Sequence, residues 1–125
     1  RRVQDVMMFW SVPDETKGSI AAPGIYRFTI EGEGIYVGRY TRSSRVLKEY
    51  VRNVEKQKSR RPYRPQDPNG FRFVHVALFR AVEDGRNIHL DIVENVPVER
   101  LNERERYWIE QIPIEQRLNG RRRPR

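Results

Sequence analysis

The chain contains no cysteine, only two histidines and no long apolar run. The lack of cysteine excludes a disulfide framework and a thiolate zinc site. No stretch approaches the roughly 20 apolar residues that a membrane-spanning helix needs, and no secretory signal is recognisable. We therefore expect a protein of the reducing cytoplasm (intracellular) that makes no contact with a membrane.

The positive charge of the chain is concentrated in one segment. Its 125 residues suit one compact domain with a modest core, and 34% of them are charged. The net charge is +8; between Arg39 and Arg64 there are ten Lys and Arg against two acidic residues, whereas the rest is balanced. A localised basic segment is typical of a surface that binds a polyanion. The plainer alternative is a solvated helix face followed by a basic loop.

Residues 24–38 are predicted to form a β-hairpin that carries two tyrosines. Side chains alternate over residues 24–30, Glu-Gly-Glu-Gly forms a turn at 31–34, and residues 35–38 begin the returning strand. Pairing of the two strands would bring Tyr26 and Tyr36 near each other at one edge of a sheet.

Three helices and a third strand are expected after this hairpin. Cap residues and helical spacing predict a helix from about Ser44 to Lys58. Residues 71–82 fit strand alternation in part, but their length favours a helix that ends at the Glu-Asp-Gly sequence 83–85. Residues 88–93 alternate as a strand, and the last helix runs from about Val98 to Ile112. The expected buried stripes are Val46, Leu47, Tyr50, Val51 and Val54 in the first helix and Val98, Leu101, Trp108, Ile109 and Ile112 in the last. These elements indicate an α+β fold.

A basic loop joins the first two helices. Residues 59–70 contain three prolines and a glycine, which prevent a regular element. Arg60, Arg61 and Arg64 surround Tyr63, a composition suited to phosphate contact with some stacking.

The chain divides into three parts. Residues 1–22 are expected to form an irregular or partly docked lead-in, with Phe9 and Trp10 at the edge of the domain. The domain itself spans residues 23–120, and residues 121–125 form a basic tail.

Glu105 lies on the apolar stripe of the last helix, one turn before Ile109. A carboxylate among core positions costs free energy unless it is paired, solvated in a cleft or bound to a metal. Glu103 and Glu110 fall off that face and are expected to be surface acids. The spacing therefore selects Glu105 as a candidate functional carboxylate.

Four short motifs give the chain a resemblance to a known family. Gly24-Ile25-Tyr26 and Tyr36-Val37-Gly38 nearly reproduce the two signature boxes of the GIY-YIG nucleases, with Val37 in place of the central isoleucine. The segment 101–109 resembles the glutamate helix of that family, and Leu118-Asn119-Gly120 its terminal asparagine. The resemblance covers about Gly24 to Gly120 and implies a small three-stranded antiparallel sheet flanked by helices.

The resemblance implies a divalent-metal-dependent DNA endonuclease that hydrolyses phosphodiester bonds and uses no small-molecule cofactor. Glu105 would hold Mg²⁺ (or Mn²⁺) through oxygen ligation, and Arg45 would contact the phosphate as a planar, permanently charged fork. Tyr26 or Tyr36 would position or deprotonate the attacking water. A free phenol has a pKa near 10, about three units above neutrality, so the metal and the arginine must assist.

The arginine departs from the register of the family. It usually follows the second tyrosine by ten residues, with His or Tyr four residues further on. Here position 46 is Val and Arg45 is one residue early, whereas Tyr50 stands at the place of the later aromatic. Arg39 and Arg42 are therefore alternatives for the phosphate contact.

Several candidates also have a structural interpretation. Asn119 and the three loop arginines are candidate DNA contacts, and His75 is a candidate proton shuttle or a structural histidine. Tyr50 is a candidate for the site or a core residue, and His89 is expected to be an exposed strand residue. For the two signature tyrosines the alternative is packing within the sheet.

Two other functions stand beside the nuclease. The first is a non-catalytic nucleic-acid-binding module on the same scaffold, with the displaced arginine marking lost activity. The second is a small basic protein that binds RNA or an acidic partner. Since one active site cuts one strand, a homodimer is one arrangement that would cut both.

Overall fold

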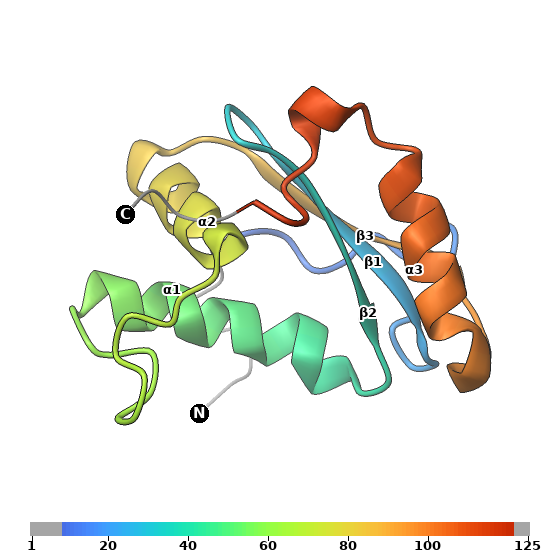
Figure 1. The fold of residues 1–125 in the computed structure, drawn as a ribbon, viewed down its shortest axis with the longest axis horizontal. Coiled ribbons are helices and arrows are strands. Elements are labelled where there is room, and N and C mark those ends of the chain that lie inside the picture. Colours follow the sequence, from blue (N-terminus) through green and yellow to red (C-terminus); the bar gives the residue numbers. More distant parts are fainter. Residues whose placement is uncertain (1–8, 122–125) are drawn as a thin grey trace.

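The fold is a three-stranded antiparallel sheet with helices on both faces (Figure 1). The computed structural model describes residues 9–121. The strands are β1 (Gly24–Ile30), β2 (Gly34–Tyr40) and β3 (Ile88–Asn95), in the order β2-β1-β3. β1 pairs antiparallel with both neighbours. The predicted α+β class and the antiparallel sheet are therefore confirmed.

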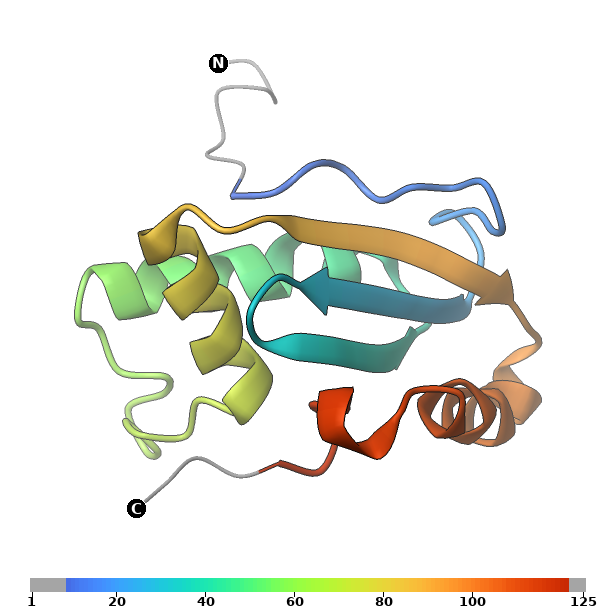
Figure 2. The same cartoon turned by 90° about the horizontal axis from the view of Figure 1, so that it is seen from above.

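Two helices cover one face of the sheet and a third covers the other (Figures 1 and 2). The first is α1 (Tyr50–Lys58), which continues from a π-helical turn at Arg45–Glu49. α2 (Phe73–Asp84) lies beside it and ends at Gly85, which adopts the left-handed conformation. α3 (Leu101–Glu110) packs on the opposite face. Short 3₁₀ turns at Val98–Arg100 and Ile114–Gln116 flank α3.

The two faces of the sheet carry separate apolar clusters. Beneath α1 and α2 the larger cluster is rich in aromatic residues, and beneath α3 the smaller one is mostly aliphatic. The larger cluster includes Trp10, Tyr26, Phe28, Val46, Tyr50, Val54, Val74 and Leu78; the smaller one contains Ile25, Val37, Val93, Val96, Leu101 and Ile112. Because both faces are covered, the sheet is a buried layer on which the helices are positioned.

Three expectations from the sequence were wrong. Tyr26 lies on the central strand and is fully buried, whereas only Tyr36 lies on an edge strand. Val98 is 58% exposed because the last helix opens with a 3₁₀ turn that lies outside its buried stripe. Leu47 is 38% exposed because it lies in the π turn, where the α-helical spacing does not apply.

The lead-in is more closely docked than a loop at the domain edge. Asp14 exchanges backbone hydrogen bonds with β3, from its N–H to Leu90 O (2.9 Å) and from Ile92 N–H to its carbonyl (2.9 Å). Trp10 is buried edge-on against Phe28, with 5.4 Å between ring centres. The lead-in therefore lies along the free edge of β3 (Figure 2). Residues 1–8, and the tail beyond Arg121, lie outside the described residues.

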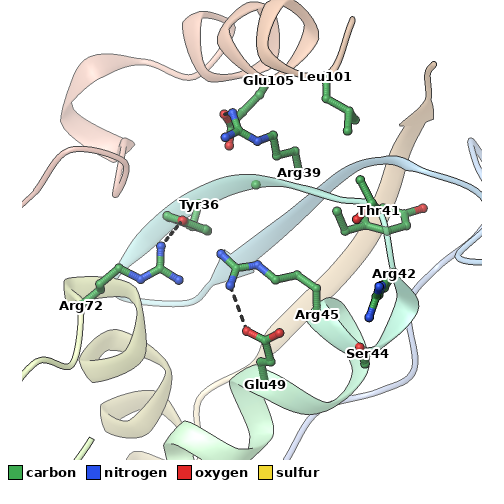
Figure 3. A pocket seen from close by; sticks show the side chains of 12 residues that line it. Tyr36, Arg39, Thr41, Arg42, Ser44, Arg45, Glu49, Arg72, Leu101 and Glu105 are labelled. Carbon is green, nitrogen blue, oxygen red and sulfur yellow. Dashed lines mark hydrogen bonds and ion pairs between the residues drawn. The ribbon is translucent and has the colours of Figure 1, made fainter. Parts of the chain in front are cut away.

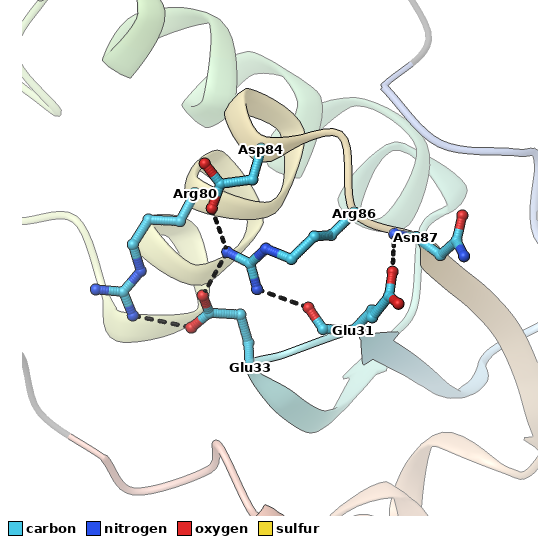
Figure 4. Close-up of polar contacts among 6 residues, drawn as sticks. All are labelled: Glu31, Glu33, Arg80, Asp84, Arg86 and Asn87. Atoms are coloured by element: carbon cyan, nitrogen blue, oxygen red, sulfur yellow. Dashed lines mark hydrogen bonds and ion pairs between the residues drawn. The ribbon is translucent and has the colours of Figure 1, made fainter.

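An ion-pair network ties the β1–β2 turn to the end of α2 (Figure 4). The Glu33 carboxylate accepts hydrogen bonds from Arg80 (2.9 Å) and Arg86 (2.8 Å). Arg86 also donates to the Asp84 carboxylate (3.0 Å) and to the Glu31 carbonyl (2.6 Å). The network therefore fixes the hairpin turn against a helix that is remote in sequence.

Within residues 9–121, no helix combines the length and the apolar character needed to cross a membrane.

The Glu33→Gln substitution is expected to lower the free energy of unfolding at neutral pH by about 1 kcal/mol. Burial alone would raise the pKa of Glu33, but the hydrogen bonds from Arg80 and Arg86 outweigh it and lower this pKa below its usual value. A carboxyl whose pKa is lower in the folded state stabilises the fold above its unfolded-state pKa, and this contribution is lost as the pH falls through the folded-state pKa.

Urea unfolding at neutral pH and at about pH 3 tests this expectation. The difference between wild type and Glu33→Gln should be present at neutral pH and should become smaller at acidic pH, as the carboxyl takes up its proton. Glu115→Gln, at an exposed position, is the control and should change neither value. An equal loss at both pH values would contradict the electrostatic role.

Candidate functional site

A pocket of about 590 Å³ opens where the end of β2, the π turn, the start of α2 and the first turns of α3 meet (Figure 3). Its lining includes a tyrosine, four arginines and two carboxylates: Tyr36, Arg39, Arg42, Arg45, Arg72, Glu49 and Glu105. These side chains come from segments up to about 70 positions apart in the chain, so only the folded structure creates the pocket.

Three tyrosines form the wall of the pocket and the core behind it. The ring centre of Tyr36 lies 6.5 Å from that of Tyr26 and 6.4 Å from that of Tyr50. Tyr26 and Tyr50 are buried, and their hydroxyl groups share a short hydrogen bond. Tyr36 is half-buried and lines the pocket. Of the two signature tyrosines, therefore, only Tyr36 reaches the pocket.

Burial keeps the two inner phenols neutral. It raises the pKa of Tyr26 well above its ordinary value of 10.0, and the neighbouring Tyr50 and Tyr36 raise it further. Burial and the proximity of Tyr36 raise the pKa of Tyr50 to about 12, against the opposing effect of Arg72 and Arg45. Neither group can therefore act as a base near neutral pH.

The glycine of the second signature box has a steric role. Gly38 pairs with Tyr26 across β1 and β2. A Cβ atom on Gly38 would overlap the phenol ring of Tyr26. Each residue of this box therefore has its own role. Tyr36 lines the pocket, Val37 is buried on the face of the sheet that α3 covers, and Gly38 leaves space for the Tyr26 ring.

The π turn brings Arg45 into register with Tyr50. In such a turn the backbone hydrogen bonds join residues five apart, so one additional residue is accommodated. Arg45 and Tyr50 are five apart, and the guanidinium carbon of Arg45 lies 5.7 Å from the Tyr50 ring centre. Val46 is fully buried instead. The one-residue displacement seen in the sequence therefore does not remove Arg45 from the aromatic cluster.

Arg45 is held charged and directed into the pocket. Its guanidinium donates to the Glu49 carboxylate at 2.9 Å. Partial burial opposes its charge, but the neighbouring Tyr50 and Tyr26 and the ion pair with Glu49 raise its pKa above the usual value.

Glu105 faces this pocket from α3 (Figure 3). Its side chain is 23% exposed and forms an ion pair with Arg39 at 3.1 Å. Arg39 also donates to the Asn102 side chain through a short hydrogen bond. Glu103 and Glu110 are exposed, as expected. The carboxylate on the apolar stripe is thus paired and partly solvated.

Among the described residues, the donor set of the pocket does not form a dedicated metal cage. Within residues 9–121, no group of three or more His, Asp or Glu side chains is arranged to hold a metal. Mg²⁺ in phosphoryl-transfer sites is commonly bound by one or two carboxylates, with the remaining ligands from water and substrate phosphates. Glu105 could supply the single carboxylate of such a site.

The alternative arginines occupy different places. Arg39 extends toward α3 and donates a hydrogen bond to the Glu105 carboxylate. Arg42 is exposed at the rim of the pocket. Of the three arginines considered for the phosphate contact, Arg45 is the one that packs on the tyrosine cluster.

His75 lies outside the pocket and supports the start of α2. It is buried, and its Nδ1 accepts the backbone N–H of Arg72 at 3.0 Å. Its Nε2 lies 3.4 Å from the Asn53 amide. These contacts favour the structural interpretation over a proton shuttle. His89, in contrast, is exposed on β3 as predicted.

Asn119 and the loop arginines are not among the residues that line the pocket of Glu105. The Asn119 side chain accepts a hydrogen bond from the Val37 N–H (2.9 Å) and donates one to the Val37 carbonyl (2.8 Å). It thereby satisfies both backbone groups of Val37 at the free edge of β2. Arg60, Arg61 and Arg64 are exposed and do not line the pocket. Arg64 stacks on Tyr63, with 4.9 Å from guanidinium carbon to ring centre. The loop is therefore a second basic surface.

Arg72 is the pocket residue that the sequence reasoning missed. It immediately precedes α2 and donates to the hydroxyl groups of Tyr36 (3.1 Å) and Tyr50 (3.5 Å). The sequence placed it in the expected helix at residues 71–82 and indicated no role for its side chain. Its contacts depend on how α2 docks against β2, which no local pattern encodes.

Comparisons of the chain with protein-family models, with curated proteins and with solved structures give no match. The resemblance to the GIY-YIG nucleases thus depends on the motifs alone, and the function taken from it is a proposal.

Proposed function

We propose that residues 23–120 form a divalent-metal-dependent DNA endonuclease domain of GIY-YIG type. The observation that carries the proposal is the convergence of Tyr36, Arg45 and Glu105, from three separate elements, on one pocket. Phosphodiester hydrolysis needs an activated water, a cation on the scissile phosphate and charge stabilisation for the leaving oxygen. A phenol, a fixed guanidinium and a carboxylate that binds a divalent ion would together supply these.

The proposed division of roles follows from burial and charge. Arg45 would donate hydrogen bonds to the phosphate, and Tyr36 would position the attacking water or accept its proton. Tyr26 and Tyr50 would hold Tyr36 in place from the core. A divalent ion bound by Glu105 would supply positive charge to the phosphate and lower the pKa of bound water. Hydrolysis adds water across one P–O bond, which leaves one product with the phosphate and the other as an alcohol.

A second candidate function is a nucleic-acid-binding module without catalysis. The ion pair between Arg39 and Glu105 favours it, because this contact neutralises the carboxylate from within the protein. The absence of a multi-carboxylate cluster among the described residues also fits this candidate. Both candidates use the same basic surface to bind DNA, and they differ only in cleavage.

The Glu105→Ala substitution is expected to lower the rate of plasmid cleavage in Mg²⁺ or Mn²⁺ by about 100-fold or more, the size of loss seen when one charge-stabilising group is removed. Binding of DNA should persist, because the basic residues are retained. Glu110→Ala, an exposed carboxylate on the same helix, is the matched control and should cleave like wild type.

Two outcomes would contradict the endonuclease. If wild type leaves plasmid DNA intact in Mg²⁺ and Mn²⁺ but shifts it in a gel at low salt, the non-catalytic module is the correct function. If Glu105→Ala cleaves as fast as wild type, the cleavage does not come from this pocket.

Replacing Arg60, Arg61 and Arg64 together by Gln should weaken DNA binding similarly for all sequences. Each lost phosphate contact should flatten the slope of log K against log salt by about 0.9. Fluorescence anisotropy over a salt series measures the slope. As a control, replacing Lys17, Arg80 and Arg100 together by Gln removes the same amount of charge elsewhere. If this control weakens DNA binding and flattens the salt slope equally, the net charge and not the loop is responsible.

A further inference from the structure

Two arginines from different elements converge on the same tyrosines. Arg45 extends from the π turn and Arg72 from the start of α2, and both point into the pocket toward Tyr36 (Figure 3). Arg72 donates to the hydroxyl groups of Tyr36 (3.1 Å) and Tyr50 (3.5 Å), and Arg45 lies over the Tyr50 ring. Tyr50 is therefore in contact with both guanidinium groups.

The two guanidinium groups repel each other, although the phenols between them stabilise both charges. Burial and, to a smaller extent, the proximity of Arg45 oppose the charge of Arg72, but the phenols of Tyr36 and Tyr50 outweigh both and raise its pKa above the usual value. A guanidinium keeps its proton in proteins, so the repulsion cannot be relieved by deprotonation. Within residues 9–121, Arg72 forms no ion pair with a carboxylate, whereas Arg45 has Glu49. A further anion between the two arginines would turn repulsion into attraction.

The position of Arg72 also suits a ligand that continues beyond the pocket. A second cavity of about 530 Å³ lies on its other side, lined by Phe71, Phe73 and Asn119 among others. The two cavities share Tyr36 and Arg72. A group bound at this boundary therefore has space on both sides, as the internal phosphate of a strand requires.

We propose that Arg72 is a second phosphate-binding arginine and that, with Arg45, it holds one phosphodiester group of a nucleic-acid strand against the Tyr36 hydroxyl. Arg72 presents five N–H donors, of which two meet phenols; the others are available to phosphate oxygens. The two-arginine phosphate site does not depend on the proposed endonuclease function. Only the further statement that the bound phosphate is the one to be cleaved rests on that function.

The test uses a ligand with a single phosphodiester group. Dithymidine monophosphate is titrated into the full chain at low ionic strength in EDTA, and the dissociation constant is measured by NMR chemical-shift changes. Because the ligand has one phosphate, two arginines that both affect its affinity must hold the same group. Its uncharged methylphosphonate analogue is the ligand control.

Arg72→Gln and Arg45→Gln are each expected to weaken binding by about tenfold or more, the effect of losing one charge-assisted hydrogen-bonding group. Arg72→Lys keeps the charge but not the fork and should fall between these variants and wild type. Arg80→Gln, on the same helix and bonded to Glu33, should bind like wild type. The methylphosphonate analogue should bind weakly to every variant.

The inference is overturned if wild type binds the methylphosphonate analogue as tightly as the phosphodiester, or if folded Arg72→Gln binds the phosphodiester like wild type. Should Arg72→Gln fail to fold by circular dichroism, Arg72→Lys decides: wild-type affinity there overturns the proposal. Because the titration contains no metal, its result is independent of cleavage. If wild type cleaves DNA but Arg72→Gln binds the phosphodiester like wild type, this inference alone is refuted. If Arg72→Gln loses affinity but wild type does not cleave DNA, only the endonuclease proposal is refuted.

Discussion

The hydrogen bond between the hydroxyl groups of Tyr26 and Tyr50 joins the centre of the sheet to the helix above it. Both partners are buried, so an unpaired hydroxyl at either position would be costly. Gly38 provides the space that the Tyr26 ring occupies. Tyr36 packs on both rings and opens to the pocket. The orientation of the Tyr36 phenol thus depends on two phenols that are buried from water.

The π turn is the local device that keeps an arginine beside this pair. In a regular α-helix, residues five positions apart lie on different sides of the helix axis, so Arg45 would point away from Tyr50. The extra residue in the turn leaves Val46 to fill the core and directs Arg45 to the pocket. The same turn exposes Leu47. A single irregularity therefore explains both the apparent shift of the arginine and the failure of the predicted apolar stripe.

The elements whose signals are local were predictable from the sequence. The hairpin turn, Gly85 after α2 and the alternation of β3 each mark their own boundaries. Glu105 was selected by the spacing of one helix, although its partner Arg39 was not foreseen as such. Tyr26 was misplaced at an edge because strand order depends on β3, which lies about 60 residues away in the chain. Arg72 was missed for the same reason, since its role appears only when α2 docks.

The arginines have different partners at the hairpin turn and around the pocket. At the hairpin turn, Arg80 and Arg86 share the Glu33 carboxylate, and Asp84 adds a second. These charges are satisfied within the protein, which stabilises the fold but leaves little attraction for an external anion. Around the pocket, the four arginines form ion pairs with two carboxylates among residues 9–121, Glu105 with Arg39 and Glu49 with Arg45. Because phenol hydroxyls accept hydrogen bonds without neutralising charge, an excess of positive potential persists there. The fold therefore neutralises its cations at the turn and leaves them available beside Tyr36, where a phosphate would complete the arrangement.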